Sequence, residues 1–243
     1  MNEAPLAAIW VYLAASPLLW LTATLACYLV AVRIYRWGGE SPLLNPVAIA
    51  VALLIGLLVW TDTPYQTYFD GAQFVHFLLG PATVSLAIPL YRQRTRLRAL
   101  AVPILASLPV SVLASSLSAL AIAWALGATP ATLISLAPKS VTAPVAMGIS
   151  EKLGGLPSLT AVLVVSTGIV GAVFGTGLFR LLRIRDEAVK GFAMGATSHG
   201  IGTARAFQVS PVMGAFSGLA MALSAFVTAL LLPPLLRWIG LTA

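Results

Sequence analysis

Charged residues are scarce in this chain of 243 amino acids. Only 9% of the residues are Asp, Glu, Lys or Arg, whereas 59% are hydrophobic, and the mean hydropathy is +0.96. A soluble domain of this size does not manage with so little charge, so a soluble fold is excluded. We predict an all-α polytopic integral membrane protein, a single transmembrane domain over residues 1–243 with about six to eight membrane segments of roughly 20 residues.

Cysteine and histidine are also scarce. The one cysteine, Cys27, lies in an apolar run, which excludes a disulfide framework. With one cysteine and two histidines the chain has no spacing typical of metal ligands, so we expect neither a metal nor a cofactor. Ser198 and His199 are adjacent, but neighbouring side chains seldom point at each other and no acid orients the imidazole. We therefore do not expect an enzyme.

Basic residues outnumber acidic residues by 14 to 7, which gives a net charge of +7. They cluster in short loops between apolar segments, as topology determinants do in membrane proteins, so we do not expect a nucleic-acid partner. Residues 92–98 contain four arginines and are the strongest positive-inside signal. Residues 180–190 form a second basic loop.

Eight apolar segments follow one another along the chain, at residues 9–32, 47–60, 74–91, 99–126, 131–153, 156–179, 191–207 and 211–236. No basic stretch precedes the first segment, so we expect it to be retained rather than cleaved as a signal peptide, with Pro17 dividing it. Gly80-Pro81 and Pro89 interrupt the third, and Pro233-Pro234 are expected to end the last. Residues 61–71 contain aspartates and aromatics but no Lys or Arg, which predicts an interfacial loop.

The number of apolar stretches between the two basic loops indicates whether the segment at 131–153 crosses the bilayer. Three apolar stretches separate the two basic loops, so the loops would lie on opposite sides if all three stretches crossed the bilayer. If residues 131–153 instead enter and leave on one side, both basic loops lie in the cytoplasm. The positive-inside rule therefore favours a re-entrant or strongly broken element there.

Polar residues stand in the middle of that segment. Lys139, Ser140 and Thr142 are flanked by prolines at 138 and 144. Proline removes a backbone donor and clashes with the preceding turn, so Pro138 and Pro144 predict a broken helix. In lipid such a break survives only where protein surrounds it or where it lines a wet cavity, and an ionisable residue there indicates a functional site.

A second interrupted helix is predicted at residues 191–207. Gly200 and Gly202 weaken the helix, and polar groups are supplied by Ser198, His199, Thr203 and Arg205. Paired broken helices typically indicate a transporter built from repeats, with its site at the midplane of the bilayer. Residues 78–89 and 135–146 share the order proline, hydroxyl, valine, hydroxyl, proline, which suggests an internal repeat.

All seven carboxylates fall in the terminus, in loops or at segment ends. None lies inside an apolar run where it could neutralise Lys139 or Arg205, and an unpaired charge in low dielectric costs of order several kcal/mol. Either water reaches these groups or an anion completes them. We infer a small organic anion, most simply a carboxylate bound by Lys139 or Arg205. The same absence weakens the case for a cation antiporter, which needs buried carboxylates.

Each of these residues also has a plainer interpretation. Lys139 can extend to an interface if the break is shallow, His199 can be a hydrogen-bonded structural histidine, and Arg205 can mark the cytoplasmic end of a helix. Gly171 and Gly175 form a small-xxx-small pair, for which we predict close helix packing rather than a ligand site.

Several motifs carry a family resemblance: LLNP (43–46), YFDG (68–71), GPATVSLAIPLY (80–91), PKSVTAPVAMGIS (138–150), GGLPSLTAV (154–162), GAVFG (171–175) and GFAMGATSHGIGTARAF (191–207). In these the chain resembles the LrgB/CidB family of bacterial membrane proteins, whose plant relative is the plastid glycolate/glycerate translocator. The resemblance implies a multi-pass protein of the bacterial inner membrane. It also implies one of two roles.

One implied role is antiholin-like: regulation of murein hydrolase export, autolysis and programmed cell death beside a separate LrgA/CidA-type membrane partner. The other is transport of small monocarboxylates such as glycolate, glycerate or pyruvate. Buried cations between helix breaks serve a carboxylate carrier and have no use in a purely structural lysis element, so we favour transport. In the lipid bilayer we expect a homo-oligomer.

The transport hypothesis assigns a role to each candidate residue. Lys139 and Arg205 bind the substrate carboxylate, and the hydroxyls of Ser140, Thr142, Ser198 and Thr203 bind its hydroxyl or keto oxygen. The backbone is held open by Pro138, Pro144, Gly200 and Gly202. His199 is the candidate proton carrier if transport is coupled to protons, because the pKa of free histidine lies near neutrality.

Overall fold

The computed structural model describes residues 17–242, without the side chains of Pro17, His76, Leu79 and Thr83. Every regular element in that range is a helix, which confirms the predicted all-α class. Five helices are long and apolar enough to cross a membrane: Leu18–Trp37, Pro42–Trp60, Ala101–Ala125, Pro157–Leu181 and Pro211–Trp238. A sixth span is added if the bent helices between Tyr65 and Arg92 count as one.

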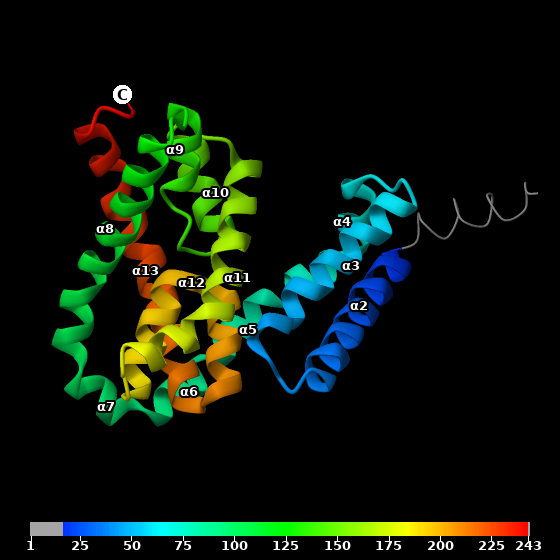
Figure 1. Ribbon diagram of the computed structural model, residues 1–243, viewed down its shortest axis with the longest axis horizontal. Coiled ribbons are helices and arrows are strands. Elements are labelled where there is room, and N and C mark those ends of the chain that lie inside the picture. Colours follow the sequence, from blue (N-terminus) through cyan, green and yellow to red (C-terminus); the bar gives the residue numbers. More distant parts are fainter. Residues whose placement is uncertain (1–16, 243) are drawn as a thin grey trace, which may run out of the picture. The chain divides into compact units, whose positions relative to one another are not determined.

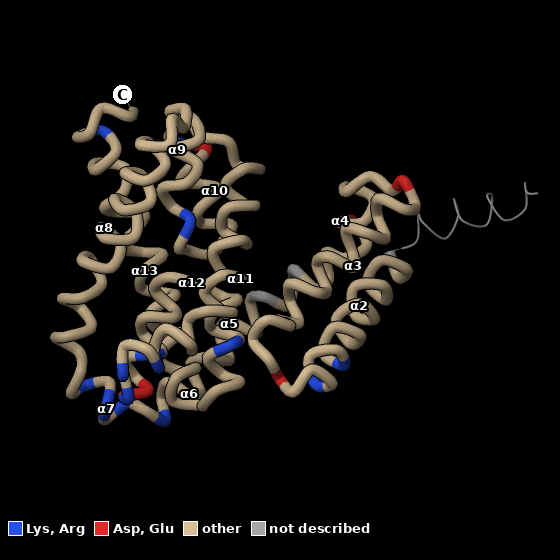
Figure 2. The backbone as a smooth tube through the Cα atoms, in the orientation of Figure 1, with Lys and Arg blue, Asp and Glu red and all other residues tan. Residues whose placement is uncertain are grey.

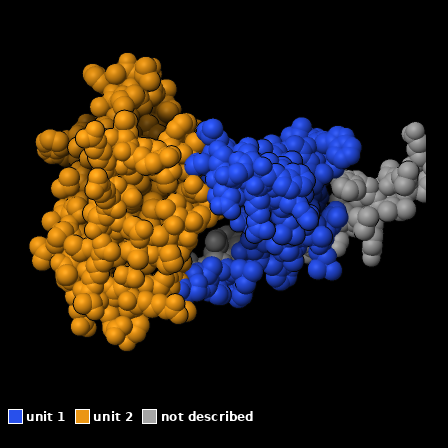
Figure 3. All heavy atoms as spheres, turned by 60° about the horizontal axis from the view of Figure 1, so that its bottom comes forward, with its two compact units in different colours: residues 1–85 blue, residues 86–243 orange. Residues whose placement is uncertain are grey.

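The chain divides into two compact units, residues 1–85 and residues 86–243, which Figure 3 colours separately. These two units are compact parts of the chain, and the prediction of a single transmembrane domain over residues 1–243 stays a prediction. Residues 9–16 of the first predicted segment lie outside the described residues.

Unit 1 contains α2 (Pro17–Trp37), η1 (Pro42–Leu44), α3 (Pro46–Trp60), α4 (Tyr65–Phe77) and α5 (Leu79–Ser85). Helix α2 packs against both α3 and α4. Its Trp20 is 1% exposed and meets Tyr68 edge-on at a centroid distance of 5.9 Å. The Asn45 side chain caps α3 by accepting hydrogen bonds from the backbone N–H groups of Val47 and Ala48.

The predicted interfacial loop at residues 61–71 is wrong in its second half, because α4 begins at Tyr65. Pro64 immediately precedes its first turn, and Gln66 donates to Asp70 one turn later at 2.8 Å, a spacing that supports a helix. The segment at 74–91 is interrupted as predicted, but the interruptions fall at Leu78 and Leu86. The prolines at 81 and 89 lie in the first turns that follow, where a missing N–H removes no intrahelical bond.

Unit 2 contains α6 (Ala87–Arg92), α7 (Arg94–Ala99), α8 (Ala101–Ala125), α9 (Pro130–Leu136), α10 (Ala143–Lys152), α11 (Pro157–Leu181), α12 (Glu187–Val209) and α13 (Pro211–Trp238). The long helices α8, α11 and α13 frame this unit in Figure 1. Between them lie two helical hairpins, one made of α9 and α10 and the other made by α12 alone.

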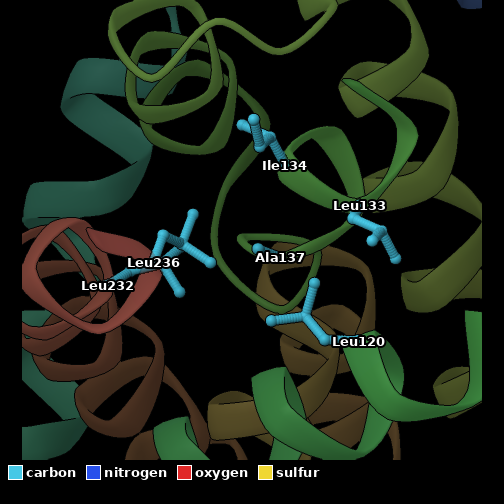
Figure 4. Close-up of a cluster of buried hydrophobic side chains, with 6 residues drawn as sticks. All are labelled: Leu120, Leu133, Ile134, Ala137, Leu232 and Leu236. Atoms are coloured by element: carbon cyan, nitrogen blue, oxygen red, sulfur yellow. The ribbon is translucent and has the colours of Figure 1, made fainter. Parts of the chain in front are cut away.

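Hairpin 1, residues 130–152, enters the unit and returns to the same end. Leu133 and Ile134 at its start belong to one apolar cluster with Leu120 of α8 and with Leu232 and Leu236 of α13, shown in Figure 4. Side chains from the end of α10 pack against this cluster, namely those of Ile149 and Leu153. The broken element predicted at 131–153 is therefore confirmed, with its tip at residues 137–142.

Hairpin 2, residues 187–209, folds back at His199, whose φ of 40° and ψ of −135° are not helical. Directly after the last residue of α12, the Ser210 hydroxyl donates to the carboxylate of Glu187, its first residue, at 2.8 Å. A Cβ on Gly202 would lie 3.2 Å from the carbonyl oxygen of Met194. In a straight helix these residues would be separated by about 12 Å. The predicted interrupted helix is thus confirmed as a second hairpin.

The two hairpins enter unit 2 from opposite ends. Arg96 forms an ion pair with Asp186 at 2.6 Å, which brings the two basic loops together at the end where hairpin 2 begins. Hairpin 1 begins at the other end of α8, and Figure 2 shows the basic residues gathered around α7, away from α9. This geometry agrees with the expectation that both basic loops lie on one side, and their cytoplasmic location stays a prediction.

Asp186 also caps hairpin 2. It accepts hydrogen bonds from the backbone N–H groups of Val189 and Ala188. The N–H of Val189 above all, then that of Ala188 and the charge of Arg96, hold the pKa of this carboxyl below its usual range. The capping carboxylate therefore stays charged beside the positive end of the helix dipole.

Two further expectations in unit 2 are wrong. Part of the basic loop at 92–98 is helical, as α7. The last helix does not stop at Pro233-Pro234 but continues through both prolines to Trp238. Leu232 and Leu236 are fully buried on either side of the prolines, so packing against hairpin 1 holds this part of α13 helical.

Glycines allow hairpin 2 to approach its neighbours closely. A Cβ on Gly171 or Gly175 of α11 would collide with Ser198 or Met194, so the predicted small-xxx-small packing is confirmed. On the other side of the hairpin, a Cβ on Gly195 would collide with the backbone carbonyl of Ser217 in α13.

We expect Gly195→Ala to lower the free energy of unfolding by about 3 kcal/mol, because the carbonyl of Ser217 cannot move without shifting α13. Gly177→Ala on α11 is the matched control, since nothing lies within 4 Å of the added Cβ. Denaturant unfolding of the purified variants in one detergent measures both. Equal stability of the two variants would contradict the close packing.

Candidate functional site

One small pocket in unit 2 lies between the tip of hairpin 1 and the first arm of hairpin 2. Its walls come from α8, from the tip of hairpin 1, from the first arm of hairpin 2 and from α13. The lining residues are Val112, Ser116, Ala137, Pro138, Ser140, Val141, Ala196 and Thr228. Elements that begin at opposite ends of the unit thus meet at this pocket.

Lys139 stands at the tip of hairpin 1 among hydroxyl groups. Its Nζ donates to Ser115 Oγ of α8 at 3.1 Å and to Ser140 Oγ at 3.3 Å. Ser115 and Ser140 are themselves hydrogen-bonded at 2.7 Å. Across the part of the chain that the structure describes, the one ion pair is that of Arg96 with Asp186, so no carboxylate pairs with Lys139 there.

The backbone at this tip is also tied to α8. Ser116 Oγ donates to the carbonyl oxygen of Ala137, which has left the helical ladder, at 3.0 Å. Thr142 stands at the N-cap of α10, but its side chain makes no capping bond. The first backbone N–H groups of α10 therefore face the tip without that partner. Pro138 is buried in the tip, whereas Pro144 lies in the first turn of α10, where proline is tolerated.

The tip of hairpin 2 is fixed by His199, which is 4% exposed. Its Nε2 lies 2.8 Å from the carbonyl oxygen of Val164 in α11 and must carry the proton, because a carbonyl only accepts. Thr203 Oγ1 donates to the carbonyl oxygen of His199 at 2.8 Å and lies 2.9 Å from Ser217 Oγ of α13. Val164 also packs against Val141 of hairpin 1, so both tips contact α11 at one residue.

The remaining predicted residues of α12 lie in different places. Ser198 is 2% exposed, contacts Gly171 and lies 3.2 Å from the Thr197 hydroxyl. Gly200 and Gly202 follow the break rather than making it, and Gly202 lets the second arm approach Ser198.

Arg205 lies further along the second arm of hairpin 2. It donates to Gln208 Oε1 at 3.1 Å and does not line the pocket. The structure thus brings Lys139 and Ser140 together and groups Ser198, His199 and Thr203 at the other tip, with Arg205 near the base of hairpin 2.

Reasoning from the sequence missed the hydroxyls that other helices contribute. Ser115, Ser116 and Thr228 belong to long apolar helices, and single hydroxyls are common in such helices. The one signal in the sequence is the adjacent pair Ser115-Ser116 in the interior of an apolar run of 25 residues.

Comparison with known proteins adds the family. The family model described as LrgB-like matches residues 24–238. The chain belongs to the LrgB-like family. Two of its relatives are YwbG and YxaC of Bacillus subtilis, which are 37% and 36% identical to it. These alignments cover 88% and 89% of this chain and 95% and 93% of the relatives.

Another member of the LrgB-like family is the holin-like protein CidB of Staphylococcus aureus. It is 31% identical to this chain over 90% of this chain and 95% of CidB. No solved structure matches the chain. The suspected LrgB/CidB family is therefore confirmed, and the chain is a multi-span membrane protein with holin-like bacterial relatives.

We expect His199→Ala to destabilise this LrgB-like protein by about 2 kcal/mol, because the buried carbonyl of Val164 loses its donor. His199→Gly loses the same bond but relieves the positive φ, so it should be about 1 kcal/mol more stable than His199→Ala. Denaturant unfolding in detergent compares the two variants with the wild type. If glycine proves no better than alanine, the chain does not carry the strained turn at this residue.

Proposed function

We propose that this protein is a membrane transporter of small monocarboxylate anions resembling glycolate, glycerate or pyruvate, bound at the tip of hairpin 1 beside the first arm of hairpin 2. The observation that carries the proposal is the position of Lys139. Its ammonium group stands at a helix break with hydroxyl partners from Ser115 and Ser140 and without a carboxylate.

A lysine in this position needs a negative partner or water. Removing an ammonium ion from bulk water costs of order several kcal/mol even after relaxation, and two neutral hydroxyls recover only part of this. A carboxylate ligand would restore the charge balance and accept from Lys139. Its other oxygen can accept from Ser140 or from the uncapped N–H groups at the start of α10.

The arrangement of the hairpins supports transport rather than static binding. Non-helical backbone at membrane depth is tolerated where protein encloses it or where it lines a water-filled cavity. Here α8 is followed by hairpin 1 and α11 by hairpin 2, and the two hairpins enter from opposite ends. Helix and hairpin units in inverted orientation, with a site near the middle of the bilayer, are an arrangement that many transporters use for alternating access.

The candidate residues have different roles in this proposal. Lys139, Ser140 and Thr142 contact the anion, although of these three only Ser140 lines the pocket. Ser116 and Thr228 add lining hydroxyls, and Ser115 adds the hydroxyl that is hydrogen-bonded to Lys139 and Ser140. Ser198, His199 and Thr203 hold the opposing tip, and His199 remains the candidate proton carrier for a coupled cycle. Arg205, which lies near the base of hairpin 2, attracts the anion at the entrance of the path.

A second candidate function is the holin-like one, and a specific observation favours it. The relative from Staphylococcus aureus, 31% identical over 90% of this chain, is named holin-like protein CidB. In this function the protein would regulate murein hydrolase export and lysis with a separate small LrgA/CidA-type partner. A lysis phenotype can also follow indirectly from altered acid flux across the membrane.

Uptake of labelled glycolate and pyruvate into proteoliposomes tests the transport proposal. We expect wild-type protein to transport at least one of the acids and Lys139→Ala to lower uptake at least 10-fold, because a hydrogen bond to a charged group contributes about 1.5–3 kcal/mol. Lys152→Ala is the matched control, since Lys152 is exposed at the end of the same hairpin.

Two results separate the candidate functions. Loss of uptake in Lys139→Ala with normal uptake in Lys152→Ala supports the transporter. If the wild type moves neither acid but releases a large entrapped dye, the transport proposal fails and the holin-like function is supported.

A further inference from the structure

The end of unit 2 that carries the two basic loops concentrates positive charge well beyond what its own acids balance. Eight basic residues lie there, against the two acids Asp186 and Glu187: Arg92, Arg94, Arg96, Arg98, Arg180, Arg183, Arg185 and Lys190. Figure 2 shows basic residues gathered around α7 at this end. The two loops are far apart in the sequence and are joined by the ion pair of Arg96 with Asp186.

Most of this charge is not used inside the protein. Asp186 is occupied by Arg96 and by the backbone of α12, and Glu187 accepts from Ser210. Arg92, Arg98 and Arg185 are exposed, and within residues 17–242 none of them forms an ion pair. Like charges held this close repel one another, so they favour an anionic partner.

The short helix α7 carries Arg94, Arg96 and Arg98 and is held in place by its apolar residues. Its Leu97, together with Leu100, packs against the cluster that contains Ala188 of α12 and Phe216 of α13. Arg98, between these two leucines, is left exposed. Tyr91 is 69% exposed just before α7, with the Arg94 guanidinium 4.8 Å from its ring centroid. Exposed aromatic and basic side chains at the end of a spanning helix are typical of the headgroup region of a bilayer.

We propose that this basic end of unit 2 is a binding surface for the headgroups of anionic phospholipids. The surface belongs to the ends of α8 and α11, two candidate spans, so the lipid phosphates lie at the level of the arginines. Guanidinium groups bind phosphate oxygens through paired N–H donors, and several act together on neighbouring headgroups. This surface goes beyond the proposed transport function and does not depend on it.

The test titrates short-chain phosphatidylglycerol into the purified full chain in a neutral detergent, with bound lipid counted by native mass spectrometry. Short-chain phosphatidylcholine, inorganic phosphate and a single-stranded oligonucleotide serve as comparison probes. We expect phosphatidylglycerol to bind at least 10-fold more tightly than phosphatidylcholine or phosphate, and binding to weaken as salt is added.

The double variant Arg98→Gln/Arg185→Gln removes one exposed charge from each loop. It should weaken phosphatidylglycerol binding about 5-fold or more, as expected for loss of charges near an anionic surface. The matched control Lys152→Gln/Arg237→Gln removes two exposed charges at the other end of the unit and should stay within about 2-fold of wild type. Arg92→Gln/Arg183→Gln replaces the first variant if that one does not fold.

Three results would overturn the proposal. The first is equal weakening in the control variant, which would mean that only total charge matters. The second is unchanged binding in the loop variants. The third is binding of phosphate or the oligonucleotide as tight as that of phosphatidylglycerol, which would assign the surface to a soluble anion.

Discussion

Backbone groups that leave a helix inside an apolar protein must find other hydrogen-bond partners, and this requirement shapes unit 2. At the tip of hairpin 1 the freed carbonyl of Ala137 accepts from Ser116 of α8. At the tip of hairpin 2, Thr203 satisfies the carbonyl of His199, and His199 donates to Val164 of α11. Hydroxyl and carbonyl groups of the long helices therefore provide the hydrogen-bond partners that the two helix breaks need, which lowers the free-energy cost of breaking a helix in an apolar environment.

The same constraint sets the site apart from its surroundings. At the hairpin 2 tip, His199 Nε2, the carbonyl of His199 and the hydroxyl of Thr203 all have partners within the protein. The tip of hairpin 1 differs, because Lys139 has neutral partners only and the start of α10 has no side-chain cap. The proposed binding of a carboxylate depends on this charge and on the N–H groups at the start of α10 that no side chain caps, and not on a likeness of fold.

Local rules in the sequence predicted much of this arrangement. Hairpin 1 was predicted from Pro138, which breaks a helix, and from the positive-inside rule applied to the two basic loops. Both effects depend on the residue types along the chain and need no knowledge of tertiary contacts. The exact position of the break in α12 was harder to predict from the sequence. The glycines at 200 and 202 suggested a break, but the chain reverses at His199, which tertiary contacts hold at positive φ. Pro233-Pro234 remain helical for a similar reason, since burial of the flanking leucines outweighs the local preference. Ser115 could not be foreseen, because its partnership with Lys139 joins elements 24 residues apart.

The most direct measurement of the central claim, that two hairpins enter from opposite membrane faces, is labelling of single cysteines with an impermeant maleimide in a Cys27→Ala background. Arg185→Cys and Val209→Cys, on either side of the hairpin 2 turn, should react from one face. Leu126→Cys and Lys152→Cys, which flank hairpin 1, should react only from the other face. Reaction of positions 185 and 209 from opposite faces would contradict the account, because α12 would then cross the membrane.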